Sequence, residues 1–169
     1  MKDMWIELKK EVLILRDTTP LRFLECLIYL IKNNQNILMT FFTKEKLETD
    51  MFILKFITQL DIKDYYVGST GNDYELIIKK SIEEEPTDYY SFWKFLSNMV
   101  LDLVVFVTDK VCPNCKSDHL RVLTDREQIN IYLYCETCFL CISEVGENVE
   151  EKELLPANIQ LIQSCKCNF

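Results

Sequence analysis

Residues 111–141 read VCPNCKSDHLRVLTDREQINIYLYCETCFLC and hold most of the eight cysteines of the chain. Two Cys-x-x-Cys pairs stand in this stretch, Cys112 with Cys115 and Cys135 with Cys138, and 19 residues separate the pairs. Two residues between cysteines let a tight turn direct both sulfurs inward, and two such turns supply four ligands for a tetrahedral ion. The spacing therefore predicts one structural zinc ion, held by these four cysteines.

The segments that join the two cysteine pairs are typical of β-strands. Residues 120–124 and 129–134 are rich in branched and aromatic side chains, which favours two strands that carry one pair to the other. Over residues 108–147 the pattern resembles the zinc-ribbon family. The resemblance implies a small metal-stabilised β module, and we expect no chemistry at the ion because four sulfurs close its coordination shell.

Other interpretations of the cysteines stay open at this stage. The pairs could be buried apolar thiols or redox dithiols, although no strand-to-helix setting for a redox pair is visible. A second metal site is conceivable from the remaining candidate ligands. These are Cys141, Cys165, Cys167 and His119. The simplest reading of His119, which follows Asp118 on an expected turn, is an exposed or hydrogen-bonding histidine.

Composition indicates a compact globular protein. The chain has 169 residues, 49% of them hydrophobic, with only three glycines and four prolines, which argues against disorder. This length suits one core, or one domain with a small metal-stabilised appendage. We predict a helical, winged-helix-like body over residues 1–107, followed by a zinc ribbon and C-terminal tail over residues 108–169.

We expect a cytoplasmic protein. Residues 1–15 mix acidic and basic side chains with apolar ones, unlike a signal peptide. The longest apolar runs, 24–31 and 101–107, are too short to span a membrane. Eight cysteines in a reducing compartment point to metal before disulfides.

The N-terminal body is predicted to be mainly helical. Apolar residues recur at three- and four-residue steps in residues 5–15 and 20–31, which predicts two helices. Thr19 is the expected N-cap of the second helix and Pro20 its first residue. The sequence then predicts a strand over residues 37–42 and a short helix over residues 43–47. A helix over residues 50–60, which Asp50 could cap, and a hairpin over residues 65–78 follow.

The order helix, strand, helix, helix, hairpin is that of a winged helix. Asp88 can cap a further long helix, and residues 103–107 are β-branched enough to become a strand that leads into the first cysteine pair. The predicted fold class is therefore α+β: a mainly helical body with a small, winged-helix-like hairpin, and a C-terminal zinc ribbon.

This element order, together with the four cysteines, is similar to the transcription factor E family, which implies a role in transcription. The expected recognition helix argues against nucleic-acid binding, because Lys55 is its only basic residue. Other bases are scattered through an acidic chain: Lys79, Lys80, Arg121 and Arg126. A winged-helix and zinc-ribbon transcription factor, or an adaptor of the transcription machinery, remains the alternative function.

Enzymatic activity is not expected. The chain has one histidine, no glycine-rich phosphate loop and no Gly-x-Ser-x-Gly motif. The carboxylates at residues 83–85 precede Pro86 and are typical of a solvated linker.

The formal charge of −8 favours a basic protein partner over phosphate backbones. In this character the chain resembles intracellular immunity proteins that neutralise bacterial toxins, many of them nucleases. The resemblance implies a non-enzymatic inhibitor that acts by stoichiometric binding. The acidic runs at residues 83–85 and 150–153 could form the contact. The candidate aromatic contacts are three tyrosine pairs: Tyr65 and Tyr66, Tyr89 and Tyr90, and Tyr132 and Tyr134. The sequence does not decide the oligomeric state.

Overall fold

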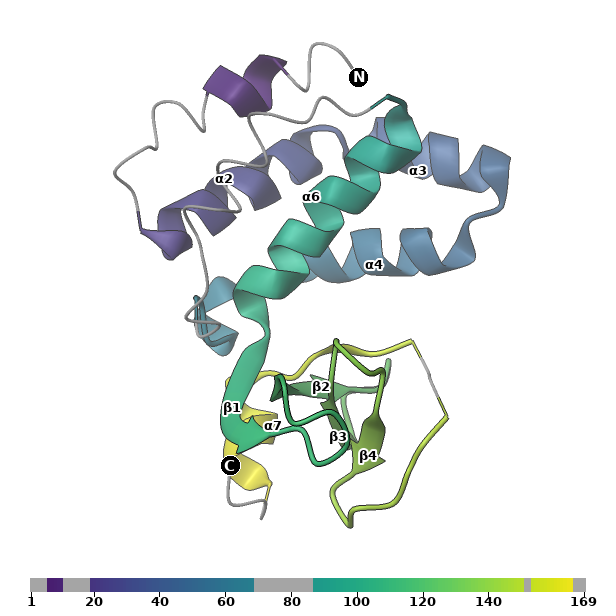
Figure 1. Ribbon diagram of the computed structural model, residues 1–169. Helices are drawn as coiled ribbons and strands as arrows, with labels where there is room; N and C mark the ends of the chain where they lie inside the picture. Colours follow the sequence, from purple (N-terminus) through teal and green to yellow (C-terminus); the bar gives the residue numbers. More distant parts are fainter. Residues whose placement is uncertain (1–5, 11–18, 69–86, 151–152, 166–169) are drawn as a thin grey trace. The chain divides into compact units, whose positions relative to one another are not determined.

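The computed structural model describes residues 6–10, 19–68, 87–150 and 153–165 (Figure 1). Contacts divide the chain into two compact units. The helical unit comprises Met1–Leu60 and Gly71–Leu103, and the ribbon unit comprises Asp61–Thr70 and Val104–Phe169. The described part of the first unit is helical and the second contains an antiparallel sheet, so the predicted α+β class is confirmed.

The helical unit contains α2 (Pro20–Asn33), α3 (Gln35–Glu45), α4 (Glu48–Gln59) and most of α6 (Tyr89–Val104) (Figure 1). Residues 6–10 form a further helical stretch in which Leu8 is fully buried. The buried apolar side chains come from all of these helices and include Phe23, Leu24, Leu27, Leu38, Phe42, Leu54, Ile57, Phe92, Trp93 and Leu96. Among the described helices, none is both long enough and apolar enough to cross a bilayer.

The start of α2 is as predicted. Pro20 is its first residue, and Oγ1 of Thr19 accepts a hydrogen bond from the backbone N–H of Arg22. Thr19 thereby satisfies one of the N–H groups that the first helical turn leaves without a partner. The helix ends where Asn34 donates from its side-chain amide to the carbonyl of Leu30, 2.9 Å away.

The prediction of a strand at residues 37–42 was wrong, because α3 covers this whole segment. The helix predicted at residues 43–47 is not a separate element, because residues 43–45 form the last turn of α3. Leu38 and Phe42 are the buried positions, one helical turn apart, whereas Ile37 is exposed. The hydroxyl of Thr40 donates to the carbonyl four residues earlier, which accommodates this β-branched residue in a helix. Lys46 ends the helix in the left-handed conformation at φ 57°.

Asp50 does not cap α4, which begins two residues earlier at Glu48. Its carboxylate is buried inside the helical unit, where it accepts a hydrogen bond from Trp93 and pairs with Lys94. The winged-helix order therefore loses its first strand. Residues 65–68 of the expected hairpin form no strand, and the rest of the hairpin lies outside the described residues.

The prediction that Asp88 caps the long helix is confirmed. Oδ1 of Asp88 accepts from the backbone N–H of Ser91 at 2.7 Å, and the backbone N–H of Asp88 donates to the Ser91 hydroxyl. This reciprocal pair is a capping box in which serine replaces the usual glutamate. The predicted change from helix to strand is also present, since α6 ends at Val104 and the first strand begins at Phe106.

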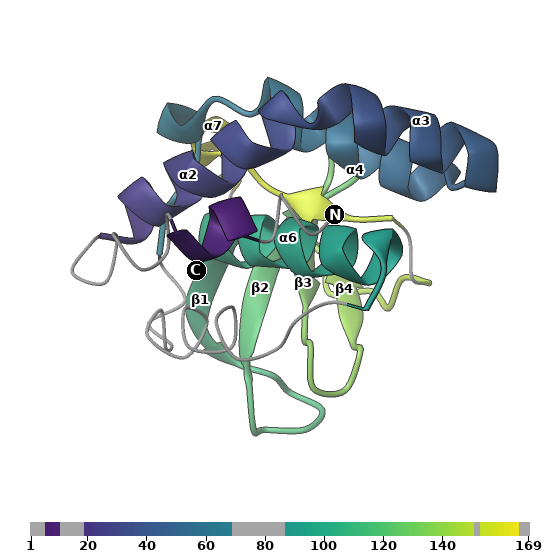
Figure 2. The ribbon, with the colours of Figure 1, turned by 90° about the horizontal axis from the view of Figure 1, so that it is seen from above.

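The sheet of the ribbon unit is antiparallel. Its strands are β1 (Phe106–Val111), β2 (His119–Thr124), β3 (Ile131–Tyr134) and β4 (Cys141–Ser143), which lie side by side in this order (Figure 2). The short β5 (Leu155–Pro156) pairs with β2, and α7 (Ile159–Ser164) follows it. The two strands predicted between the cysteine pairs are thus confirmed as β2 and β3.

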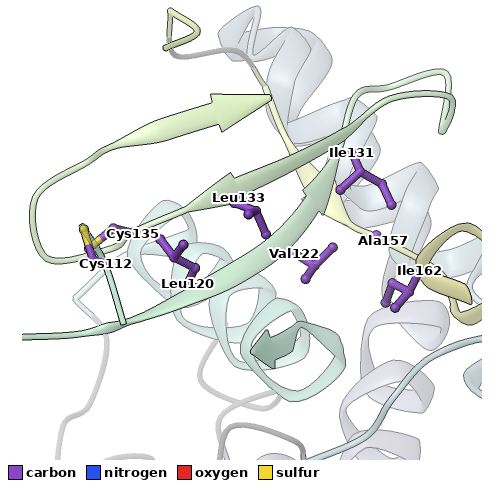
Figure 3. Close-up of a cluster of buried hydrophobic side chains, with 8 residues drawn as sticks. All are labelled: Cys112, Leu120, Val122, Ile131, Leu133, Cys135, Ala157 and Ile162. Carbon is purple, nitrogen blue, oxygen red and sulfur yellow. The ribbon is translucent and has the colours of Figure 1, made fainter. Parts of the chain in front are cut away.

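One face of β2 and β3 carries the core of this unit (Figure 3). Val122 and Leu133 are cross-strand partners on that face, and Ile162 of α7 packs into the same cluster. The C-terminal segment therefore returns to the ribbon, through β5 and α7, although no sequence signal predicted this.

The segment Asp61–Thr70 also belongs to the ribbon unit. The rings of Tyr66 and Phe106 lie with their centroids 4.8 Å apart. Tyr65 hydrogen-bonds to Gln128, whose Oε1 accepts from the side-chain amide of Asn158 at 3.0 Å. These contacts fasten the segment to the turn between β2 and β3.

Candidate metal centre

Two turns at the same end of the sheet bring the four predicted ligands together. Cys112 and Cys115 lie between β1 and β2, and Cys135 and Cys138 lie between β3 and β4. All four Sγ atoms lie within 4.8 Å of one another. The Sγ atoms of Cys112 and Cys138 are 3.5 Å apart, and those of Cys115 and Cys135 are 3.6 Å apart.

These distances fit a single tetrahedral ion. Ligands about 2.3 Å from zinc, the usual Zn–S distance, stand about 3.8 Å from one another at the corners of a tetrahedron. A disulfide would need sulfurs about 2.05 Å apart, so the cysteines are not paired as disulfides. Four converging thiols form a donor set that soft tetrahedral metals such as zinc prefer. The arrangement is consistent with a zinc-ribbon-like site.

The two turns share one backbone feature, a left-handed residue, and each is closed by its own backbone hydrogen bond. The residue after each second cysteine is left-handed: Lys116 has φ 56° and Phe139 has φ 58°. In the first turn the N–H of Lys116 donates to the carbonyl of Cys112, and in the second the N–H of Cys135 donates to the carbonyl of Leu140. Non-glycine residues are strained in this region, so the surrounding contacts must hold both turns in place.

Asp118 joins the two turns. Its Oδ2 accepts hydrogen bonds from Nη1 of Arg121 at 3.1 Å and from the hydroxyl of Thr137 at 3.2 Å. Its Oδ1 accepts from the N–H of His119, and its backbone carbonyl accepts from the N–H of Cys112. Partial burial acts to raise the pKa of Asp118, but the charge of Arg121 and these hydrogen bonds lower it overall.

The thiols of the cluster differ in acidity. Hydrogen bonds from the side chain and backbone of Ser117 lower the pKa of Cys115 to about 6. A hydrogen bond from the side chain of Asn114 lowers the pKa of Cys138, whereas burial raises the pKa of Cys135 to about 12. The more exposed cysteine of each pair is therefore disposed toward the thiolate form that metals bind.

The cluster of four cysteines continues into the apolar core. The sulfurs of Cys112 and Cys135 lie at one end of the buried cluster, and Ile131 lies toward the other end (Figure 3). Both cysteines are fully buried. Val122, which lies between the cysteines and Ile131 (Figure 3), is also fully buried. An ion at the sulfurs would thus complete a core that is small for an independent module.

Cys141, Cys165 and His119 do not join this cluster. Within the described parts of the chain, the four cysteines of the turns are the one group of side chains positioned to hold a metal. Cys165 packs against the apolar core, Cys141 is buried in β4, and His119 is exposed at the start of β2. Cys167 lies outside the described residues.

The expected interaction residues meet different environments. Tyr65 and Tyr132 are buried and Tyr66 packs on Phe106, so of the six tyrosines only Tyr89 and Tyr90 are exposed, at 36% and 40%. The arginines between the cysteine pairs are both ion-paired, Arg121 with Asp118 and Glu136 and Arg126 with Glu153. Lys79, Lys80 and residues 83–85 lie outside the described part of the chain.

Sequence reasoning missed the role of Asp118. Its spacing to Arg121 is compatible with a local ion pair, but no pattern links it to Thr137, 19 residues further on. Comparison with known proteins adds no assignment, because no family model, curated protein or solved structure matches this chain.

Proposed function

We propose that this protein is a non-enzymatic binding module whose ribbon is stabilised by one zinc ion at Cys112, Cys115, Cys135 and Cys138. The observation that supports this most directly is the convergence of four sulfurs within 4.8 Å of one another. Four thiolates fill a tetrahedral shell, which leaves no coordination position for a substrate or an activated water. Bound zinc would cross-link the two turns and contribute folding free energy.

The partner in this proposal is a basic protein. The chain carries a formal charge of −8, and four thiolates with one divalent cation would make the folded protein more acidic still. Arg121 and Arg126 are engaged by carboxylates, which reduces what they can offer to a phosphate backbone. An acidic surface instead accelerates encounter with a basic one. We infer a stoichiometric inhibitor that acts in a reducing compartment, in the manner of immunity proteins that cover nuclease toxins.

The experiment uses the zinc-loaded full chain as bait in extracts of its source cells. Each captured protein is then purified and mixed with the chain at a one-to-one ratio. We expect a basic partner and an association rate that falls as salt rises, because screening beyond a Debye length of about 8 Å weakens steering. A nuclease partner should lose its cleavage activity in the mixture. Charge reversal of the runs at 83–85 and 150–153, as two separate groups, locates the contact.

A gel-shift measurement with duplex DNA at physiological salt is the counter-test. Sub-micromolar affinity that weakens steeply with salt would contradict the proposal and favour the transcription-factor alternative. Failure to recover a partner of net positive charge would equally contradict it.

A further inference from the structure

The two most exposed large apolar side chains among the described residues converge on one hollow of the ribbon unit. Val145 is 80% exposed and Ile129 is 69% exposed. Both line a surface hollow of about 260 Å³, together with Tyr132 and Ser143, which are cross-strand partners in β3 and β4. This volume is close to that of one large side chain, below the usual range of sites for small organic ligands.

The turn from Ser143 to Gly146 does not need an apolar residue at Val145 to form. Ser143 accepts a hydrogen bond at its carbonyl from the N–H of Gly146, which closes a four-residue turn with Glu144 and Val145 at its corners. Gly146 has φ 84°, a conformation that glycine adopts without strain. Corner positions of such turns usually take small polar residues. Val145 therefore exposes an apolar surface that the turn itself does not need.

One carboxylate lines the hollow, and a second is fixed in the loop that carries Ile129. Exposed Glu144 lines it beside Val145. Asp125 lies beside Ile129, since its Oδ1 accepts a hydrogen bond from the Ile129 N–H at 2.9 Å. Arg126, in the same loop, is neutralised by an ion pair with Glu153. The hollow thus combines exposed apolar side chains with one lining carboxylate, that of Glu144, and no lining cation.

We propose that this hollow receives an arginine side chain of the protein partner. The aliphatic stem of arginine would contact Ile129 and Val145, and its guanidinium would meet Glu144, whose carboxylate matches the planar fork of donors. This inference rests on the proposed function for the existence of a basic partner. It goes further by naming the recognised group and its place, next to Ile131, which Figure 3 shows at the end of β3 away from Cys135.

A second hollow offers an internal comparison. It lies in the helical unit, is larger at about 430 Å³, and is lined by Ile37, Phe41 and Tyr89. Its one charged lining residue is Lys44, which repels a guanidinium. Apolar exposure alone would make both hollows bind the same probe, whereas charge complementarity selects the hollow of the ribbon unit.

The test is a titration of the isotope-labelled, zinc-loaded chain with N-acetyl-arginine amide at physiological salt, followed by backbone NMR. We expect saturable shifts at Ile129, Glu144 and Val145, with a dissociation constant on the order of 1 mM, which suits a ligand of this size. N-acetyl-norleucine amide, which keeps an apolar stem, and guanidinium chloride, which keeps the charge, should each bind at least several-fold more weakly.

Surface variants keep the test independent of folding. Val145→Ser and Glu144→Lys alter exposed side chains, and each should weaken arginine binding several-fold while the remaining amide spectrum stays unchanged. The matched controls are Ile37→Ser and Glu25→Lys, which make comparable changes at exposed positions of the helical unit and should leave the affinity unaltered.

Three results of the titration would overturn the inference: no saturable shift, shifts centred on Ile37 and Lys44, or concentration-dependent shifts without the probe, which would identify a second copy of this chain as the occupant. The proposed function fails on different evidence, namely the absence of a basic partner. If a basic partner binds and Val145→Ser and Glu144→Lys do not change its affinity, the inference fails while the proposed function stands.

Discussion

Nε1 of Trp93 donates a hydrogen bond to Oδ1 of Asp50 over 2.7 Å, across 43 residues of sequence. Nζ of Lys94 lies 2.8 Å from the same oxygen and 5.3 Å from the centre of the Tyr90 ring. Trp93 is fully buried and Asp50 is 3% exposed, so this carboxylate joins α4 to α6 inside the helical unit. A buried charge of this kind is stable only while its partners remain.

Asp50→Ala should therefore destabilise the chain by about 1–3 kcal/mol, because it leaves a buried indole N–H without an acceptor. Glu25→Ala, which removes an exposed carboxylate from α2, should stay within about 0.5 kcal/mol of the wild type. Urea unfolding followed by circular dichroism measures both. Trp93→Phe completes a double-mutant cycle, and a coupling energy near zero would show that the hydrogen bond is not formed in solution.

The ion pair of Lys94 with Asp50 makes the stability of the helical unit depend on pH. Burial acts to lower the pKa of Lys94, but the hydrogen bond and charge of Asp50 raise it above the ordinary value of 10.5. A raised pKa in the folded state means that the stabilisation is complete below pH 10.5 and is lost as the pH rises through the higher folded value.

The stability difference between the wild type and Lys94→Met should therefore shrink at strongly alkaline pH. Lys55→Met, which removes a lysine from an exposed position of α4, provides the matched control. Chemical unfolding at a series of pH values measures both differences. A difference for Lys94→Met that stayed constant to high pH would contradict the assignment.

The left-handed residues of the cysteine turns provide a test of the site's geometry. An L-residue in this conformation costs about 1–2 kcal/mol relative to glycine. Phe139→Gly should therefore yield a more stable metal-loaded ribbon than Phe139→Ala, by about 1 kcal/mol. Both variants remove the exposed ring, so their difference isolates the backbone. Equal stability of the two variants would mean that Phe139 does not have a positive φ in solution.

The ribbon was predictable from the sequence because its determinants are local and regular. Two residues inside each cysteine pair and the alternation of residues 131–134 suffice for the turns, the strands and the face that Leu133 buries. Contacts between residues far apart in the sequence leave no periodic pattern from which they could be predicted. Examples are the hydrogen bond of Thr137 to Asp118 and the packing of Ile162 on the sheet.

In the helical unit the error at residues 37–42 has a different cause. Threonine and phenylalanine favour strands by intrinsic preference, but burial at Leu38 and Phe42 follows the period of a helix. Tertiary packing therefore made this segment helical, although its residues prefer strands. Asp50 was misread for a related reason, since an aspartate near a helix start is usually a cap, and its distant partner Trp93 gives no sequence signal.

Asp118 should control metal affinity without being a ligand. Groups that orient metal ligands through hydrogen bonds typically change affinity about 10–100-fold when they are removed. We expect Asp118→Ala to weaken zinc binding in this range, because the two turns lose their shared acceptor. Asp109→Ala, which removes an exposed carboxylate from β1, should bind zinc like the wild type. Competition with a chromophoric chelator measures these affinities, and equal values for the two variants would exclude the positioning role.

Metal removal should unfold the ribbon unit before the helical unit. Elemental analysis should find one zinc per chain, and Cys115→Ser should lower the metal content, since it removes one of four converging sulfurs. The ribbon core is small and would gain stability from an ion at the four cysteines, whereas the helical unit buries Trp93 and many other apolar side chains of its own. Chelation should therefore abolish the dispersed amide signals of Val122 and Leu133 first, while the indole N–H signal of Trp93, held by Asp50, persists.

Re-addition of zinc should restore the strand signals, and cobalt should give the absorption of a tetrahedral thiolate site. Simultaneous loss of the Trp93 signal would show that the two units fold as one, and a ribbon spectrum unchanged by chelation would contradict the metal assignment itself.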